Sequence, residues 1–339
     1  MQEKIQETGN LLDDQGELRG YGWSERPLLR YRRSAVKASW LRIKEWDYYL
    51  VLGPEYGVAF TIADIGYLSQ ASVSVIDLEA KRAVTETPMR LLTRGRTGLP
   101  PDSGDGIVRL RQGGASLRFE RQGERRTLGV DFPRFDGGRG LSGSVELVQS
   151  AGDDSIVLAT PFDKPRAFYF NEKLVCMPAS GSLRYGDRDL SFAPGTSFGT
   201  LDWGRGVWPY RNTWYWGGGA GIVNGRRFGF NIGYGFGAND RATENALFLD
   251  GKIHKLEEVV FHIDEGDYLR PWSFSSSDGR FEMSFEPILD RSARASFLAI
   301  KTDQHQIFGR YSGIAVLDGG ERIELDGLLG FAEKVVNLW

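Results

Sequence analysis

Apolar and polar residues alternate along most of this chain in short runs, and glycine-containing turns separate one run from the next. The clearest run places Phe228, Phe230, Ile232, Tyr234 and Phe236 at every second position. A period of two residues is typical of strands that bury one face, whereas the spacing of three or four residues that indicates helices is nearly absent. The pattern therefore predicts strands and very little helix.

Six turns join two alternating runs, and each predicts an antiparallel hairpin. They lie at Gly113-Gly114, 186–188, Asn224-Gly225, Asp250-Gly251, Asp278-Gly279 and 318–320. Open sheets of this size would leave unpaired edges, so we expect the strands to form barrels or sandwiches. The predicted fold class is all-β, with two tandem antiparallel barrel or sandwich domains.

Two polar segments interrupt the alternation. Residues 99–106 predict a loop that is too poor in apolar side chains to be packed, and residues 150–155 predict a second loop near the middle of the chain. We take the second loop to lie close to a domain boundary. The expected organisation is an N-terminal arm over 1–33, a first β-barrel domain over 34–165 and a second over 166–339.

Composition agrees with a β-protein, because 44 of the 339 residues are glycine and 12% are aromatic. The net charge is −3, so the chain lacks the basic surplus of most nucleic-acid-binding proteins, and we expect no nucleic-acid partner. No run of 18 apolar residues predicts a transmembrane segment, and the N-terminus lacks the apolar core of a signal peptide. A cytoplasmic location is therefore expected, and the sequence does not fix the oligomeric state.

Metal and cofactor motifs are not evident in the sequence. His254, His262 and His305 have no metal-ligand spacing, and Cys176 lies in an apolar stretch that predicts a buried thiol. The glycines of 217–221 resemble a phosphate loop, but no Gly-Lys-Ser/Thr ending and no helix follow. We expect no metal and no cofactor, and we expect these glycines to permit close approach of bulky neighbours.

The stretch 201–216 has the strongest functional character, with four tryptophans, two tyrosines, two arginines and one carboxylate. Trp214 and Trp216 are two residues apart, so on a strand their side chains share a face. Aromatic walls with a few polar groups are typical of pockets that bind small molecules. The predicted ligand-binding residues are Trp203, Trp208, Trp214, Trp216, Phe230, Tyr234 and Phe236.

The predicted catalytic residues are Asp202, Arg205 and Tyr210. Loss of hydration among aromatic rings would raise the pKa of Asp202 and allow it to act as a general acid, whereas Arg205 nearby would keep it ionised. The sequence does not decide between these effects. In the alternative interpretation Asp202 and Arg205 form a buried structural pair, and the tryptophans fill a barrel core.

Four stretches in this order resemble an uncharacterised family of bacteria and fungi, domain-of-unknown-function family 2804. They are residues 22–28, 44–49, 202–206 and 330–333. More distantly, the second half is similar to the hydroxyneurosporene synthase (carotenoid hydratase) and AttH-like group. The shared pattern is a Trp/Asp-containing segment, then a Trp-x-Trp strand, then the Asn224-Gly225 hairpin.

The distant resemblance implies two tandem lipocalin-like barrels and, in some relatives, acid-catalysed hydration or cyclisation. That group has a histidine beside its aspartate, whereas Trp203-Gly204-Arg205 follows Asp202 here. Only Asp202 therefore matches the family's acid pair, and Arg205 occupies the altered position.

Three functions remain open at this stage. The first is an enzyme that hydrates, isomerises or cyclises an apolar substrate such as a lipid, terpenoid or polyene, with Asp202 as the acid or base. The second is a carrier that binds such a molecule without chemistry. The third is a carbohydrate-binding or interaction module that uses exposed aromatic rings. The sequence does not decide whether the protein is an enzyme.

Overall fold

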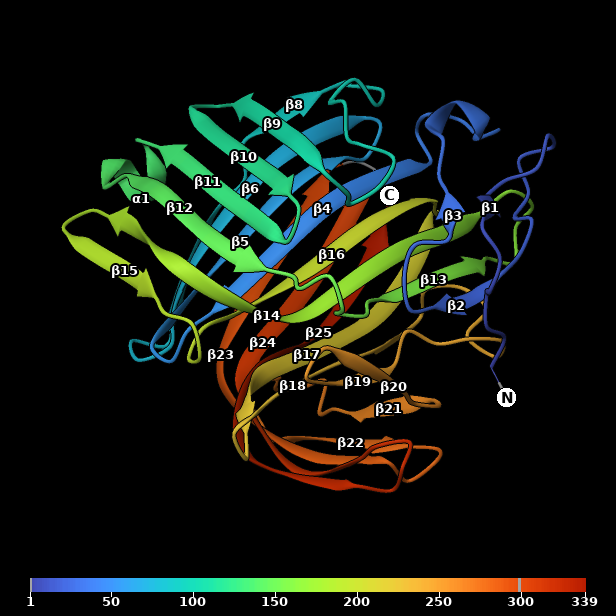
Figure 1. The fold of residues 1–339 in the computed structure, drawn as a ribbon. Coiled ribbons are helices and arrows are strands. Elements are labelled where there is room, and N and C mark those ends of the chain that lie inside the picture. The colour runs from blue at the N-terminus through green and yellow to red at the C-terminus, as the bar shows by residue number, and fades with distance from the viewer. Residues whose placement is uncertain (1, 298–299) are drawn as a thin grey trace.

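Strands account for most of the computed structural model, which describes residues 2–297 and 300–339 (Figure 1). Within these ranges, helix is limited to a 3-10 turn at Arg33–Ala35 and the four-residue α1 at Phe135–Gly138. Among the named strands of the described residues, every pair but β1–β3 is antiparallel, and the longest ladders join β23, β24 and β25. The all-β prediction is therefore confirmed.

The first sheet contains fourteen strands, ten of which follow the order β7-β6-β5-β4-β16-β14-β12-β11-β10-β9. The other four attach at the sides, where β13 and β15 pair with β14, β2 pairs with β13, and β8 pairs with β6. The bounds are β2 Gly22–Ser24, β4 Ile43–Leu52, β5 Tyr56–Asp64, β6 Leu68–Asp77, β7 Arg82–Glu86, β8 Met89–Leu91, β9 Gly106–Gln112, β10 Ala115–Gln122, β11 Arg125–Phe132, β12 Leu141–Val148, β13 Ile156–Pro161, β14 Phe168–Tyr185, β15 Arg188–Phe192 and β16 Phe198–Val207.

The second sheet contains nine strands in the order β20-β19-β18-β17-β25-β24-β23-β22-β21. Their bounds are β17 Arg211–Val223, β18 Arg226–Tyr234, β19 Ala246–Leu249, β20 Lys252–Lys255, β21 Val259–His262, β22 Trp272–Ser276, β23 Phe281–Phe297, β24 Ile300–Val316 and β25 Arg322–Leu338. A separate two-stranded parallel sheet joins β1 at Gly9–Asn10 to β3 at Leu29–Arg30.

All six predicted hairpins form. The pairs are β9–β10, β14–β15, β17–β18, β19–β20, β22–β23 and β24–β25. Asn224 and Asp250 have positive φ angles of 51° and 49° at the turns they introduce. These are residue types that tolerate the left-handed region, so the turn chemistry read from the sequence corresponds to the backbone.

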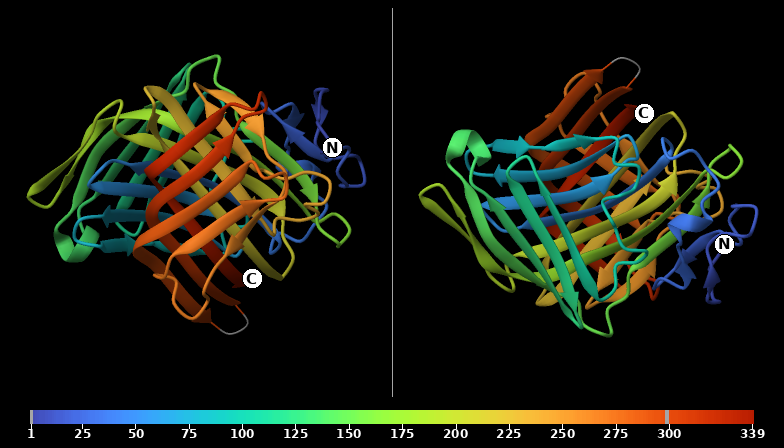
Figure 2. Two further views of the ribbon diagram at one scale, coloured as in Figure 1. Left: turned by 90° about the horizontal axis from the view of Figure 1, so that it is seen from below. Right: turned by 90° about the horizontal axis from the view of Figure 1, so that it is seen from above.

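Both sheets are curled (Figure 2), and each encloses its own apolar core. A third cluster combines side chains of both sheets. We call this third group the interface cluster. Its buried members are Tyr48, Leu50, Ala59, Ile76, Leu78, Tyr169, Trp208, Trp216, Phe236, Leu289, Phe308 and Phe331. Because both sheets contribute large side chains to it, the two curled sheets pack against each other through an aromatic layer.

Strand β16 separates the first core from the interface cluster, and all ten of its residues are buried. Leu201, Trp203 and Val207 belong to the first core. Asp202 lies on the opposite face, since successive side chains of a strand alternate, and Trp208 directly after the strand belongs to the interface cluster. Both faces of this strand are therefore occupied by protein.

The change from the first sheet to the second falls between Val207 and Arg211. The sequence placed the boundary at 165/166, but β14 and β16 are hydrogen-bonded into the first sheet by β4 and β12. The division into two domains stays a prediction. The first sheet extends past residue 166 because β14 spans 18 residues and pairs with β12, β13, β15 and β16.

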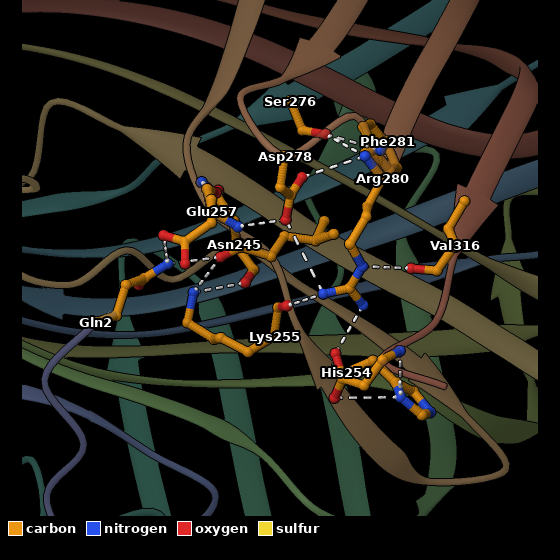
Figure 3. Close-up of polar contacts among 12 residues, drawn as sticks. Gln2, Asn245, His254, Lys255, Glu257, Ser276, Asp278, Arg280, Phe281 and Val316 are labelled. Atoms are coloured by element: carbon orange, nitrogen blue, oxygen red, sulfur yellow. Dashed lines mark hydrogen bonds and ion pairs between the residues drawn. The ribbon is translucent and has the colours of Figure 1, made fainter. Parts of the chain in front are cut away.

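The N-terminal segment lies against both sheets. Gln2 donates from Nε2 to the Leu256 carbonyl at 2.8 Å and to Glu257 at 2.9 Å, beside a polar cluster that contains Lys255 and Arg280 (Figure 3). Strand β2 pairs with β13 of the first sheet. The N-terminal segment therefore contacts both sheets, and the arm over 1–33 stays a prediction.

Cys176 is buried in β14, and burial raises the pKa of its thiol to about 12. The thiol is therefore protonated at neutral pH, in agreement with the buried, unreactive cysteine that the sequence predicts. Across 2–297 and 300–339, no helix combines the length and apolar character needed to cross a membrane.

Candidate functional site

Aromatic side chains of the two sheets meet near the connection from β16 to β17. The ring of Trp208 lies 4.9 Å from Tyr169, 5.7 Å from Trp46 and 5.5 Å from Trp214. Phe236 extends the group, with its ring 5.7 Å from that of Tyr169. Offset and tilted contacts at these distances are favourable, so the rings form one packed layer.

A buried ionic cluster lies next to these rings. Nζ of Lys173 is 2.8 Å from Oδ1 of Asp202 and 3.9 Å from Oε1 of Glu244. Asp202 also accepts a hydrogen bond from Nε1 of Trp46 at 3.0 Å and one from the hydroxyl of Tyr169 at 3.4 Å. The ammonium group of Lys173 therefore lies near two carboxylates, and the side chains of Trp46 and Tyr169 donate hydrogen bonds to that of Asp202.

Amide side chains hold the second carboxylate of the cluster. Glu244 accepts from Nδ2 of Asn171 at 2.6 Å and from Nδ2 of Asn231 at 3.2 Å. Asn231 in turn accepts from Nε1 of Trp216 at 2.8 Å, and the same indole ring lies 4.2 Å from Nζ of Lys173. Burial raises the pKa of Glu244, because the charged form loses its hydration.

A third buried acid, Glu333 on β25, lies beneath Trp214. It accepts hydrogen bonds from Nε1 of Trp214 and Nε2 of Gln306, both at 2.9 Å. Burial raises the pKa of Glu333 to about 7, although these donors favour its charged form. This carboxyl therefore changes protonation near neutral pH, which is the property required of a general acid or base.

Two clefts open beside the aromatic layer. The first has a volume of about 460 Å³, and Val207, Trp208, Pro209 and Tyr210 form one of its walls. The second, of about 270 Å³, is lined by Phe162, Pro209, Asn212 and two glycines, among other residues. Both are lined by Pro209 and Lys164, so they flank the same connection between the sheets. Asp202 lines neither of these two clefts.

Five of the predicted site residues meet at the interface between the sheets. They are Asp202, Trp208, Trp214, Trp216 and Phe236. Tyr210 is 41% exposed and lines the first cleft. The roles proposed for these residues stay predictions, but their placement brings aromatic surface, a carboxylate and a cleft into one region.

Arg205 and Trp203 lie on the other face of β16, inside the first curled sheet. Nη2 of Arg205 pairs with Oδ1 of Asp47 at 2.8 Å, and its guanidinium lies 4.3 Å from the ring of Trp203. The alternative interpretation, in which Asp202 pairs with Arg205, is therefore wrong. They are three positions apart in sequence, so on a strand their side chains point to opposite faces.

Phe230 and Tyr234 lie inside the second curled sheet. Phe230 is buried against Phe281 and Tyr311, and the ring of Tyr234 stacks on that of Tyr215 at 4.5 Å. Both belong to the second core or pack against it, away from the interface cluster. The aromatic alternation of β18 therefore reflects core packing, as the alternative interpretation of the sequence allowed.

Sequence reasoning missed Lys173, Glu244, Glu333, Trp46 and Tyr169. One indication was available in the first half of β14. Tyr169, Asn171 and Lys173 stand at every second position there, so their side chains share one face of the strand. This pattern indicates a strand with a second, polar buried face. Trp46 and Glu333 lie in the stretches 44–49 and 330–333 that carry the family resemblance, but no role was predicted for them. Glu244 has no such pattern and reaches the site only through the pairing of distant strands.

The two curled antiparallel sheets give this chain a double lipocalin-like fold. The family described as Domain of unknown function (DUF2804) matches residues 2–339, and the chain belongs to this family. This confirms the resemblance stated from the sequence. No curated protein matches the chain in sequence.

Solved structures with a similar fold include that of CghA with Sch210972. It has a TM-score of 0.53 and 14% identity, over 90% of this chain and 91% of that one. Kievitone hydratase from Nectria haematococca has a TM-score of 0.49 and 12% identity, over 87% and 88%. An AttH-like protein from Nitrosomonas europaea has a TM-score of 0.45 and 12% identity, over 90% and 96%. At these identities the similarity concerns the fold alone.

Proposed function

We propose that the protein binds an apolar small molecule in the clefts beside Trp208. The observation that carries this proposal is the convergence of both clefts on Pro209, directly after an indole that belongs to the aromatic layer. A volume of about 460 Å³ lies within the roughly 300–1,000 Å³ usual for ligand pockets. Aromatic and proline surface at such a place favours an apolar guest, because its burial removes apolar area from water.

Binding without chemistry is the function that the geometry supports best. Asp202 is enclosed by Lys173, Trp46 and Tyr169, and it lines neither of the two clefts. An acid must come within hydrogen-bond reach of the atom that it protonates. With the side chains in these positions, a molecule in the clefts has no direct access to Asp202, and a carrier accounts for the arrangement.

Acid–base conversion of the bound molecule is the second candidate, and one observation favours it. Burial raises the pKa of Glu333 to about 7, and the ring of Trp214, which donates to this carboxyl, contacts Trp208 at 5.5 Å. Movement of Trp214 away from Trp208 would connect the acid to the cleft. Hydration, isomerisation or cyclisation of a lipid, terpenoid or polyene would use such a group.

The binding proposal is tested by filling the first cleft. Ala38 lines it and is half-buried, so Ala38→Phe adds a ring to the cleft without removing a core side chain. Titration with the neutral dye Nile red should show binding to the unaltered protein, at least tenfold weaker binding to Ala38→Phe, and unchanged binding to Ala151→Phe. Ala151 lies on the exposed loop 150–155 and makes a matched control. Equal affinity in all three proteins would reject the clefts as the binding site.

The catalytic candidate needs a different measurement. Native mass spectrometry of the purified protein would identify a co-purified apolar molecule, and incubation of the protein with that molecule would reveal any product. Conversion that is lost in Glu333→Gln, with binding retained, would support acid–base chemistry. If the unaltered protein does not convert the molecule, the result would support the carrier function and reject the catalytic one.

A further inference from the structure

The first cleft has an unusual charge for a protein whose net charge is −3. Its lining includes four basic side chains, Lys37, Arg42, Lys164 and Arg166, and a single acidic one, Glu17. An excess of positive charge around a concave surface attracts anions and focuses their field. The cleft therefore has positively charged side chains in its lining as well as apolar ones.

Three of these cations are not neutralised by a partner. Across 2–297 and 300–339, the side chains of Lys37, Lys164 and Arg166 take part in no ion pair or hydrogen bond, and all three are exposed. Oε2 of Glu17 accepts the backbone N–H of Arg166 at 2.9 Å, so this single carboxylate contacts the main chain of Arg166 and forms no ion pair with the three cations. The positive charge at the rim is thus available to a ligand.

The fourth cation has a structural role. Arg42 donates from Nη1 to the carbonyl of Trp339 at 2.9 Å and from Nη2 to the carbonyl of Trp208. It thereby connects the cleft wall to the end of β25. In addition, Nε1 of Trp208 is a buried donor that lacks an acceptor among the described residues. Trp208 itself is only 1% exposed, so the accessible apolar side chains of the lining are those of Pro165, Pro209 and Tyr210, with free positive charge at the rim.

We propose that this cleft selects apolar molecules that carry one anionic group, so that the ligand is an anionic amphiphile such as a long-chain carboxylate. This inference rests on the proposed binding function and adds its substrate class. The apolar body would lie against Pro165, Pro209 and Tyr210, and the anionic group would lie at the rim formed by Lys37, Lys164 and Arg166. Charge complementarity of this kind gives selectivity more than raw affinity.

The test compares dodecanoate with 1-dodecanol, which share an apolar chain and differ in charge. At pH 8 and low salt, displacement of Nile red should show dodecanoate binding at least tenfold more tightly than dodecanol. The triple variant Lys37→Gln/Lys164→Gln/Arg166→Gln should lose this preference and keep its affinity for dodecanol. Salt at 0.5 M should weaken the preference, because exposed charges are screened.

A second triple variant controls for the change in net charge. Arg90→Gln/Arg109→Gln/Arg111→Gln removes three exposed arginines outside the cleft and should keep the full preference for dodecanoate. Equal affinity for the two probes, with Ala38→Phe still blocking dodecanol, would overturn the anionic class and leave the proposed binding function intact. No binding of either probe would overturn both. Sedimentation with phosphatidylglycerol vesicles without binding of free dodecanoate would also overturn the proposal and indicate a membrane surface instead.

Discussion

Lys173 and Asp202 face each other directly across the β14–β16 ladder, and their charged atoms are 2.8 Å apart. Their side chains are only 1% and 11% exposed. Cross-strand neighbours on one face of a sheet have their Cβ atoms about 5 Å apart, so the register itself brings the two charges together. Glu244, from the loop before β19, then approaches the same ammonium group.

Removal of the lysine should be more harmful than removal of either acid. Lys173→Met leaves Asp202 and Glu244 buried without their common cation, and breaking a buried ion pair in this way costs about 3–5 kcal/mol. Asp202→Asn leaves Lys173 with Glu244, so a smaller loss of about 2 kcal/mol is expected. Urea unfolding at pH 7.5 measures both values.

The exposed pair of Arg184 and Asp189 provides the control, with side chains 51% and 61% exposed. Asp189→Asn should change the free energy of unfolding by less than about 1 kcal/mol. Equal losses in Lys173→Met and Asp202→Asn would mean that Glu244 does not share the lysine.

Gly204 on β16 should not tolerate a side chain. A Cβ at this position would overlap the ring of Trp46, whose Nε1 donates to Asp202. Gly204→Ala should therefore cost about 1–3 kcal/mol through overpacking and disturb the indole. The melting temperature and the near-ultraviolet circular dichroism of tryptophan would report the two effects. Gly152→Ala adds a methyl group where no atom lies within 4 Å, and it should be neutral.

Stability should depend on pH through Glu333. The folded protein raises the pKa of this carboxyl from 4.5 to about 7, so between these values the folded state holds a proton that the unfolded chain has released. The free energy of unfolding then falls as the pH rises through this window, by about 3 kcal/mol for this group. Glu333→Gln does not ionise, so its stability relative to the unaltered protein should rise from pH 4.5 to 7.5.

Glu258→Gln, at an exposed position of the second half, is the matched control for this experiment. Its stability relative to the unaltered protein should stay constant over the same range. A constant difference for Glu333→Gln as well would contradict the prediction, because it would show that folding does not raise the pKa of Glu333.

Arg205 should hold the loop 99–106 in place. Its guanidinium donates to the Pro100 carbonyl from Nε at 3.3 Å and from Nη2 at 2.9 Å, while Nη1 donates to the Trp46 carbonyl at 2.6 Å. The single ammonium of Arg205→Lys cannot reach all of these acceptors. Hydrogen exchange in the loop should accelerate, while the second sheet stays protected.

Arg188→Lys supplies the comparison for that experiment, because Arg188 is an exposed arginine paired with Asp77. It should leave the exchange pattern of the loop unchanged. Slow exchange of the loop amides in Arg205→Lys would show that other contacts hold the loop, such as the hydrogen bond of 2.9 Å from Arg126 to the Ser103 carbonyl.

Local sequence patterns were sufficient to predict the hairpins, because Asn224-Gly225 and similar turns specify their geometry within a few residues. They were also sufficient to place Trp214 and Trp216 in the same interface region, since strand alternation needs no knowledge of partners. The same alternation separates Asp202 from Arg205. The alternative in which those two residues pair is wrong because it relied on closeness in sequence and not on the face of the strand.

Local sequence patterns could not predict the buried ionic cluster. Lys173, Glu244 and Glu333 come from β14, the loop before β19 and β25, and only the register of distant strands brings them to one region. The loop 99–106 shows the same limit. Its few apolar residues predicted an unpacked segment, yet Ser103 is buried because Arg126 and Glu172 bind it with polar contacts.

Strand β16 has protein on both sides, with Trp203 and Arg205 on one face and Asp202 on the other. Deleting or inserting one residue within it would exchange the two faces of every position that follows. If the change precedes Asp202, Arg205 would then face the aromatic layer and Asp202 would face the first core. Substitutions can alter either compartment separately, but a change in the length of this strand would disrupt both compartments together.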